Sequence, residues 1–378
     1  MDTSVETPVV TPQERLMSLD ALRGFDMFWI VGGGIILGRL AETLQSLWVD
    51  QVIVPHTEHV PWEGFVAWDL IMPLFLFVVG TAMPFSFAKR LGRGSSKSRL
   101  FLHILYRVII LWILGMIVQG RLLHYELSSL RLYSNTLQAI AAGYLIASIL
   151  LLNLRVHWQA VVTVVLLLLY WALLALVPVP GFGAGELTPD GNLAIYLDKL
   201  ILGPYQDGTS YTWILSSMTF AATVMMGAFA GQLLRCELSQ ARKTLFLLGG
   251  GIACIYLGSW WGLIFPIIKH IWTSSMVLYA GGWSLVLLGA FYLIIDVCRL
   301  RFLAFPVVVI GMNAIFAYVA TSLFGWRRPV FRNIAEVFLA GLESRLGIWY
   351  GPVIAVATFL VLWLILLFMY RRKIFIKI

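Results

Sequence analysis

The sequence predicts an all-α, polytopic integral membrane protein, a helical bundle with about ten spans. Of its 378 residues, 60% are hydrophobic and 12% are charged, and this charged fraction is about half that of a typical soluble protein. Many apolar runs reach the roughly 20 residues that a helix needs to cross a bilayer. Short polar connections separate these runs, as is typical of a helical bundle rather than of a transmembrane barrel.

The expected spans follow the apolar runs in order along the chain. They cover residues 22–40, 66–88, 100–120, 134–153, 158–178, 212–234, 244–265, 272–296, 302–324 and 350–370. Basic residues gather in alternate connections, so that about 18 of the 27 lie on one side of the membrane. The positive-inside rule makes that side cytoplasmic and places both termini there. Because these charges do not form one solvated basic domain, the expected partner is the lipid bilayer and not nucleic acid.

Two segments are predicted for the domain organisation. Residues 1–19 are polar and contain prolines, so we expect a cytoplasmic tail rather than a cleavable signal. Residues 20–378 form a single transmembrane domain. The longest external segments, 41–65, 179–211 and 325–349, are the expected substrate-facing loops. Within the last of them, residues 331–346 have helical apolar spacing, which fits either a helix along the outer membrane surface or a simple connector.

Ionisable residues inside a span are costly and therefore point to function. Asp20, Arg23 and Asp26 open the first span, and Arg23 lies three residues from each acid, on neighbouring turns of one helical face. This spacing fits a self-neutralising cluster or a site for an anionic ligand that enters from the cytoplasm.

The densest polar and aromatic region is the external loop from His56 to Gly64 together with Trp68 and Asp69. Imidazole is the group best suited to exchange a proton near neutral pH. Zinc binding by His56 and His59 lacks clear further ligands, and the three cysteines show no metal-ligand spacing. An ordinary interfacial loop with a Trp anchor is the structural alternative.

Small and amide residues inside the spans have two readings each. Gly33 and Gly34 let another helix pack closely, or they leave room for an extended ligand such as a pantetheine arm. Gln138 and Asn313 either join two helices or bind a ligand. Lys269 lies at an outer boundary, where the positive-inside bias does not explain a basic residue.

At these residues the sequence resembles the heparan-alpha-glucosaminide N-acetyltransferase family of transmembrane acyltransferases. The first match is the stretch Arg15-Leu-Met-Ser-Leu-Asp-Ala-Leu-Arg-Gly24. The second runs from His59, Trp62 and Gly64 to Asp69-Leu-Ile-Met-Pro-Leu-Phe-Leu-Phe-Val-Val-Gly80. Weaker matches follow at Leu137-Gln138, 269–275 and Gly311-Met312-Asn313. Two positions depart from the family pattern: Gly34 stands about where the family has an Asn, and Ala139 where it has an Arg.

The resemblance implies acetyl transfer from cytoplasmic acetyl-CoA to the amine of a glucosamine unit across the membrane, with His59 as the active-site histidine. His59 would act as a base, or accept the acetyl group first. The remaining expected roles are catalytic support, contact with acetyl-CoA near the basic face, and contact with the sugar. Catalytic support is expected from Asp69 and Asp26. Contact with acetyl-CoA is expected from Arg23, Asp20, Gly33, Gly34, Gln138 and Arg90. Contact with the sugar is expected from Trp62, Glu63, Trp68, Lys269 and Asn313.

No metal is expected, and the likeness to bacterial relatives suggests a bacterial inner membrane with His59 at the periplasmic boundary. Two rival functions remain open: an amino-sugar transporter, and acyl transfer to a cell-envelope polysaccharide. A homodimer also remains open.

Overall fold

The computed structural model describes residues 16–376, so most of the predicted 1–19 tail lies outside the described residues. Within this range the regular secondary structure is helical, and the only β-type pairings are two isolated bridges, Glu63 with Ile268 and Val179 with Gly183. The α-helices are α1 (Met17–Phe28), α2 (Gly34–Leu44), α3 (Ile71–Leu91), α4 (Lys97–Val118), α5 (Thr136–Asn153), α6 (Val156–Leu176), α7 (Leu193–Leu202), α8 (Ser217–Arg235), α9 (Gln240–Gly262), α10 (Ser274–Phe291), α11 (Arg301–Gly311), α12 (Ala314–Thr321), α13 (Val330–Phe338), α14 (Glu343–Leu346) and α15 (Tyr350–Arg371). This confirms the predicted all-α class.

The described residues contain nine helices that are long and apolar enough to cross a membrane, and a bent pair that makes a tenth span. The first span joins α1 to α2 through a π-helical turn and runs from Met17 to Leu44. The bent pair is α11 and α12, which meet at 56°. The expected number of spans is therefore confirmed, but the expected continuous helix over 302–324 is broken near Asn313.

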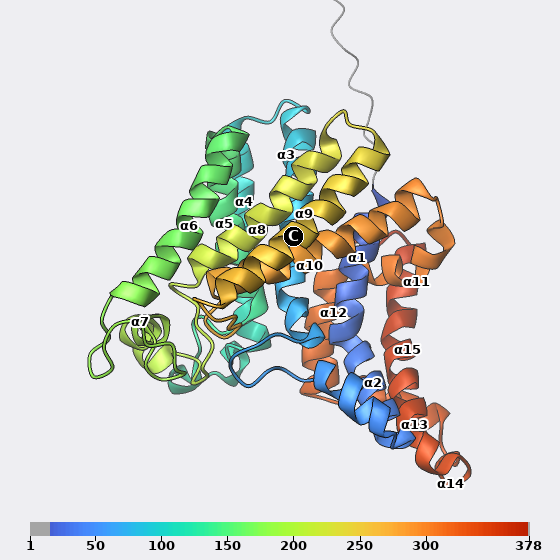
Figure 1. Cartoon of the computed structure of the whole chain (residues 1–378). Coiled ribbons are helices and arrows are strands. Elements are labelled where there is room, and N and C mark those ends of the chain that lie inside the picture. The colour runs from blue at the N-terminus through green and yellow to red at the C-terminus, as the bar shows by residue number, and fades with distance from the viewer. Residues whose placement is uncertain (1–15, 377–378) are drawn as a thin grey trace, which may run out of the picture.

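The helices pack as a bundle in which α3 lies at the centre and contacts α1, α5, α8 and α10 (Figure 1). The contact of α3 with α8 depends on glycine. A Cβ added to Gly80 would collide with the carbonyl of Val224, and one added to Gly227 would collide with the carbonyl of Phe77. Small residues that let backbones approach are typical of membrane helix pairs. This crossing fixes the position of α3, and α3 follows directly on Asp69.

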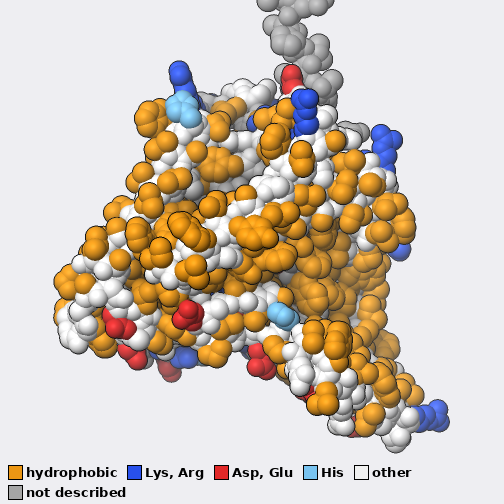
Figure 2. Space-filling model, viewed as in Figure 1, with side chains coloured by type: hydrophobic (Ala, Val, Ile, Leu, Met, Phe, Trp, Pro, Cys, Tyr) orange, Lys and Arg blue, Asp and Glu red, His pale blue; other side chains and the backbone are white. Residues whose placement is uncertain are grey.

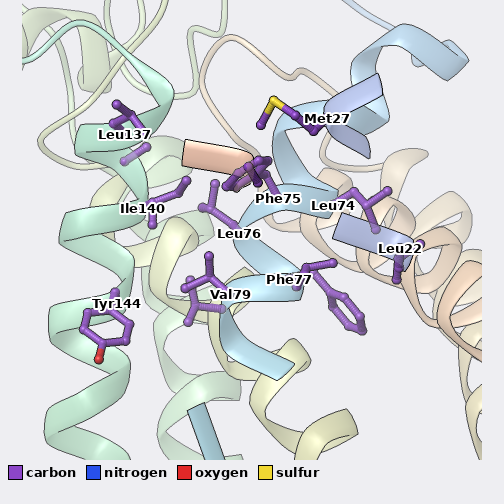
Figure 3. Packing of buried hydrophobic residues seen from close by; sticks show 14 of the residues in the cluster. Leu22, Met27, Leu74, Phe75, Leu76, Phe77, Val79, Leu137, Ile140 and Tyr144 are labelled. Atoms are coloured by element: carbon purple, nitrogen blue, oxygen red, sulfur yellow. The ribbon is translucent and has the colours of Figure 1, made fainter. Parts of the chain in front are cut away.

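The apolar core surrounds α3. Residues Leu74, Phe75, Leu76 and Phe77 point into it and meet side chains of α1 and α5, as Figure 3 shows. Because lipid tails are as apolar as these side chains, tight packing rather than exclusion of water holds such a core together.

The two ends of the bundle differ in charge. In the view of Figure 2 most acidic side chains lie along the lower edge, at the end that holds α7 and α13 in Figure 1. The basic turn between α3 and α4 lies at the opposite end. This polarity fits the positive-inside argument, although the direction of insertion stays a prediction.

The helix expected within 331–346 is present as α13, which packs against α15 and buries Phe331 and Ala335. Val337 and Phe338 are exposed on its other side. An apolar exposed face fits the predicted position along the membrane surface.

Candidate functional site

Three charged or titratable side chains meet where the loop before α3 touches the loop after α9. His59 Nδ1 lies 2.8 Å from Asp69 Oδ1, and Lys269 Nζ lies 3.2 Å from the same oxygen. Lys269 Nζ is also 3.1 Å from His59 Nδ1. Asp69 and Lys269 are buried, with side chains 2% and 6% exposed, whereas the His59 side chain is 43% exposed. The histidine therefore faces solvent while its two partners lie behind it.

Backbone contacts hold this cluster in place. Asp69 Oδ2 accepts hydrogen bonds from the backbone N–H groups of Val66 at 3.2 Å and Val60 at 3.4 Å. The backbone N–H of Gly64 donates to the carbonyl of Ile267 at 2.9 Å, which joins the two loops beside Lys269. Gly64 has a φ of +119°, a conformation that only glycine adopts without strain. The local fold thus presents Asp69 to His59 in a fixed orientation.

The contacts define the tautomer of His59. A carboxylate accepts hydrogen bonds and an ammonium only donates them. The arrangement that satisfies both partners has His59 Nδ1–H and Lys269 Nζ–H donating to the shared oxygen of Asp69. In this arrangement His59 Nε2 carries no proton and its lone pair is free. The assignment is an inference from the hydrogen-bond network.

Burial lowers the pKa of Lys269 to about 8, although the neighbouring Asp69 carboxylate works in the opposite direction. At pH 7 the lysine is therefore mostly charged and balances Asp69. The cluster as a whole is neutral as long as His59 is neutral.

His59 and Lys269 open onto a cavity of about 380 Å³. Its walls combine aromatic and polar side chains from several helix ends. The remaining lining residues are Ile30, Trp68, Ile71, Met72, Gln119, Ser134, Asn135, Thr136, Asp207, Thr209, Tyr211, Trp213, Tyr318 and Trp326. Aromatic walls with a few convergent polar groups are typical of a small-molecule site.

Three rings beside the cavity hold its loops together. The rings of Trp62 and His270 stack with their centroids 5.2 Å apart, and the centroid of the Tyr211 ring lies 4.2 Å from that of His270. Burial lowers the pKa of His270 to about 4, so its ring stays neutral. The Trp62 indole donates to the carbonyl of Leu187 at 3.0 Å. Trp62 was expected to contact the sugar, but its ring and its N–H are engaged within the protein and it does not line the cavity.

Trp68 does line the cavity, as expected for a sugar-contacting residue, and it also borders a second cavity of about 320 Å³. Glu63 is exposed and pairs with Ile268 through the backbone bridge. Lys269 is in the cavity, as expected.

The second cavity is mainly apolar, and Asp26 and His56 are among its lining residues. Asp26 is 1% exposed, and neither of its carboxylate oxygens has a hydrogen-bond partner within the described residues. Arg23 pairs with Asp20 at 3.4 Å. The expected three-residue cluster is thus a pair plus a separate acid, and Asp26 does not share the cavity of His59.

The glycines of the first span are covered by aromatic rings. A Cβ on Gly33 would collide with Phe28, and one on Gly34 would collide with Trp68. Gly33 is thus covered by a ring of its own span and Gly34 by a ring from the segment before α3.

Two further residues expected at ligands are engaged within the protein. The Gln138 side chain caps its own loop, since it donates to the Leu132 carbonyl at 2.7 Å and accepts from the Ser134 N–H at 2.9 Å. The Asn313 amide binds the backbone of Ile374 and Ile376 at 3.0 and 2.9 Å. It therefore ties the bent span to the C-terminal segment and not to a sugar.

Arg90 lies at the far end of α3, where it contacts His103 at 2.8 Å. At 1.5 Å per residue it is about 30 Å along the helix from Asp69. It lies in the last turn of α3, at the basic end of the bundle where contact with acetyl-CoA was expected.

The loop before α8 supplies site residues that the sequence did not single out. Asp207, Tyr211 and Trp213 line the cavity, as do Tyr318 and Trp326 from the bent span and the turn after it. The segment 179–211 was expected to face the substrate, but its individual residues were not identified. The feature of the sequence that could have pointed to these residues is a polar Asp-Gly turn between aromatic residues.

Across residues 16–376, no group of three or more His, Cys, Asp or Glu side chains is placed to hold a metal ion. His56 and His59, the pair considered for zinc, line different cavities.

Comparisons with known proteins show what the chain as a whole is similar to. Residues 15–195 match the family described as "Domain of unknown function (DUF5009)". Over 428 aligned residues the chain is 26% identical to heparan-alpha-glucosaminide N-acetyltransferase of Homo sapiens and 25% identical to that of Mus musculus. The chain is therefore similar to these acetyltransferases. The alignment covers 96% of this chain and 60% of each relative, and it confirms the resemblance seen in the sequence.

Proposed function

We propose that this protein transfers an acetyl group from acetyl-CoA to the amine of glucosamine or of a glucosamine-containing sugar. The contact of His59 with Asp69 at the mouth of an aromatic cavity carries the proposal. The similarity to heparan-alpha-glucosaminide N-acetyltransferase supplies the reaction class. Residues 20–378 act as one transmembrane acyltransferase domain in this proposal.

The chemistry follows from the free lone pair on His59 Nε2. The amine nitrogen of the sugar attacks the carbonyl carbon of the thioester, and the carbon–sulfur bond breaks. His59 Nε2 accepts the proton that the amine loses and returns it to the departing CoA sulfur. Asp69 keeps Nδ1 protonated and orients the ring, as the carboxylate of an Asp-His pair does in other enzymes. An acetyl-histidine route uses the same lone pair as a nucleophile.

The acetyl-CoA is cytoplasmic in this proposal, and the sugar reaches His59 from the opposite side of a bacterial inner membrane. The support is the charge polarity of the bundle: the basic turn after α3 and the His59 cavity lie at opposite ends of α3.

The first test is CoA release from acetyl-CoA by the detergent-purified protein, with and without glucosamine. We expect release that depends on the sugar and that falls by about 10²–10⁴-fold in His59→Ala. His124→Ala is the matched control, because His124 is an exposed histidine in the loop between α4 and α5 and does not line the cavity.

No CoA release with any amino sugar would refute the proposal. Accumulation of unmodified sugar in vesicles without acetyl-CoA would then identify a carrier. Release with polymers but not with free sugars would move the acceptor to an envelope polysaccharide.

A further inference from the structure

Asp207 is an acidic residue of the cavity that the reaction as proposed above does not use. It lies in the loop between α7 and α8, on the wall formed with Thr209, Tyr211 and Trp213. His59 and Lys269 line the same cavity from different loops. Any small molecule that fills this space is therefore exposed to both groups.

Four hydrogen bonds fix the carboxylate of Asp207. Oδ1 accepts from Gln206 Nε2 at 3.0 Å and from the Thr209 N–H at 2.9 Å, and Oδ2 accepts from Thr209 Oγ1 at 2.8 Å and from Trp213 Nε1 at 2.9 Å. All four donors are neutral. The group is therefore held in one orientation while its negative charge remains uncompensated by these contacts.

The charge balance of the cavity is consequently negative. Lys269 is already paired with Asp69, and no ion pair to Asp207 occurs within residues 16–376. Asp198 lies behind the same loop, where it accepts the N–H groups of Trp213 and Ile214 at 2.7 and 2.9 Å. Burial raises the pKa of Asp198 to about 7, and the charge of Asp207 adds to this effect. The loop that carries Asp207 and Asp198 therefore disfavours a further negative charge and favours a bound cation.

We propose that Asp207 binds the ammonium group of the acceptor and so makes the site specific for amino sugars over neutral sugars. This inference rests on the proposed function and names the residue that selects its substrate. Because the four hydrogen bonds already use the lone pairs of both Asp207 oxygens, the ammonium takes the place of one neutral donor. The charge-assisted hydrogen bond that it makes is stronger than the neutral one that it replaces. The flanking rings of Tyr211 and Trp213 supply apolar surface for the sugar. The bound ammonium first loses one proton to solvent, which frees the nitrogen lone pair for attack on the thioester. His59 Nε2 then accepts the second proton as the nitrogen is acylated and passes it to the departing sulfur.

The test compares glucosamine with glucose, which carries a hydroxyl where glucosamine carries the amine. Ligand-induced thermal stabilisation of the purified protein reports binding without acetyl-CoA, and the KM for glucosamine in CoA release reports it during turnover. In wild type we expect binding to favour glucosamine by about 10-fold or more. In Asp207→Asn this preference should vanish, with a higher KM and a smaller change in kcat.

Two further variants separate charge from loop structure. Asp207→Glu keeps the charge and should keep a preference for the amine even if both sugars bind more weakly. Asp190→Asn is the matched control, because Asp190 is an exposed acid of the same external segment that pairs with Lys199 and lies outside the cavity. It should leave the preference unchanged.

The inference is overturned if Asp207→Asn retains the wild-type preference, or if the Asn and Glu variants lose it equally. A protein that binds amino sugars through Asp207 but releases no CoA would refute the proposed function and leave this inference standing.

Discussion

Replacing Asp69 with Asn tests the centre of the site most directly. The substitution conserves size and removes the negative charge that both His59 and Lys269 contact, at 2.8 and 3.2 Å. An Asn amide can donate to His59 Nδ1, which would move the imidazole proton to Nε2. The lone pair that accepts the amine proton would then be lost.

The expected loss of kcat follows from this change of tautomer. General-base catalysis contributes about 10²–10⁴-fold, and the equivalent Asp→Asn change in a catalytic triad costs about 10⁴-fold. We therefore expect Asp69→Asn to lower kcat by 10²–10⁴-fold. The variant should also be less stable, by about 3–5 kcal/mol, because Lys269 keeps a buried charge without its partner. Replacing Lys269 with Met in the same chain should recover much of that stability but not the activity.

The assay is CoA release at saturating glucosamine, with thermal unfolding in detergent as the measure of folding. Glu58→Gln is the control, since Glu58 is an exposed acid next to His59 with no part in the cluster. A folded Asp69→Asn protein whose kcat lies within about threefold of wild type would refute the assigned role, because the loss expected from a misplaced proton is at least 10²-fold.

Three further predictions concern Lys269, Asp26 and Gly80. With a pKa of about 8, Lys269 is mostly charged at pH 7 and mostly neutral at pH 9. The rate of CoA release should therefore fall above pH 8. The variant Lys269→Arg stays charged, so a fall of its rate at the same pH would contradict the prediction. Asp26 is buried and its carboxylate accepts no hydrogen bond from residues 16–376, so Asp26→Leu should raise the unfolding temperature or leave it unchanged. A clear decrease would contradict this prediction. Gly80→Ala should destabilise the protein by about 1–3 kcal/mol, because the added methyl collides with the Val224 carbonyl across the α3–α8 contact; the matched change Gly249→Ala, where a Cβ meets no atom, should show no such loss in the same unfolding assay.

Sequence reasoning reached the membrane class and the number of spans because these depend on composition and on the length of apolar runs, both of which are local. It also selected His59, Trp68 and Lys269, which line one cavity, and Asp69, which contacts His59 and Lys269 behind it. Sequence reasoning found these four because polar and aromatic residues stand out from the apolar spans beside them, so that each could be recognised by itself.

The same reasoning grouped Asp26 with the catalytic residues and placed Gln138, Asn313 and Trp62 at ligands. The structure does not place these four side chains in the His59 cavity. The sequence alone could not show this, because a buried amide, acid or indole has the same sequence signature whether its partner is a ligand or a neighbouring loop. Only the structure shows that Gln138 caps its own loop and that Asn313 holds the C-terminal segment.

The sequence by itself determined a bundle of about ten apolar helices with a polar, histidine-bearing loop at one boundary, because hydrophobic periodicity and length are written in consecutive residues. Only the tertiary structure showed that Lys269, which is 200 residues from Asp69, contacts the same Asp69 oxygen as His59. It also showed that the 203–213 loop completes the cavity with Asp207. Such contacts depend on how glycine-mediated crossings such as that of α3 with α8 set the positions of whole helices. That three-dimensional packing is not encoded in any local pattern of the chain.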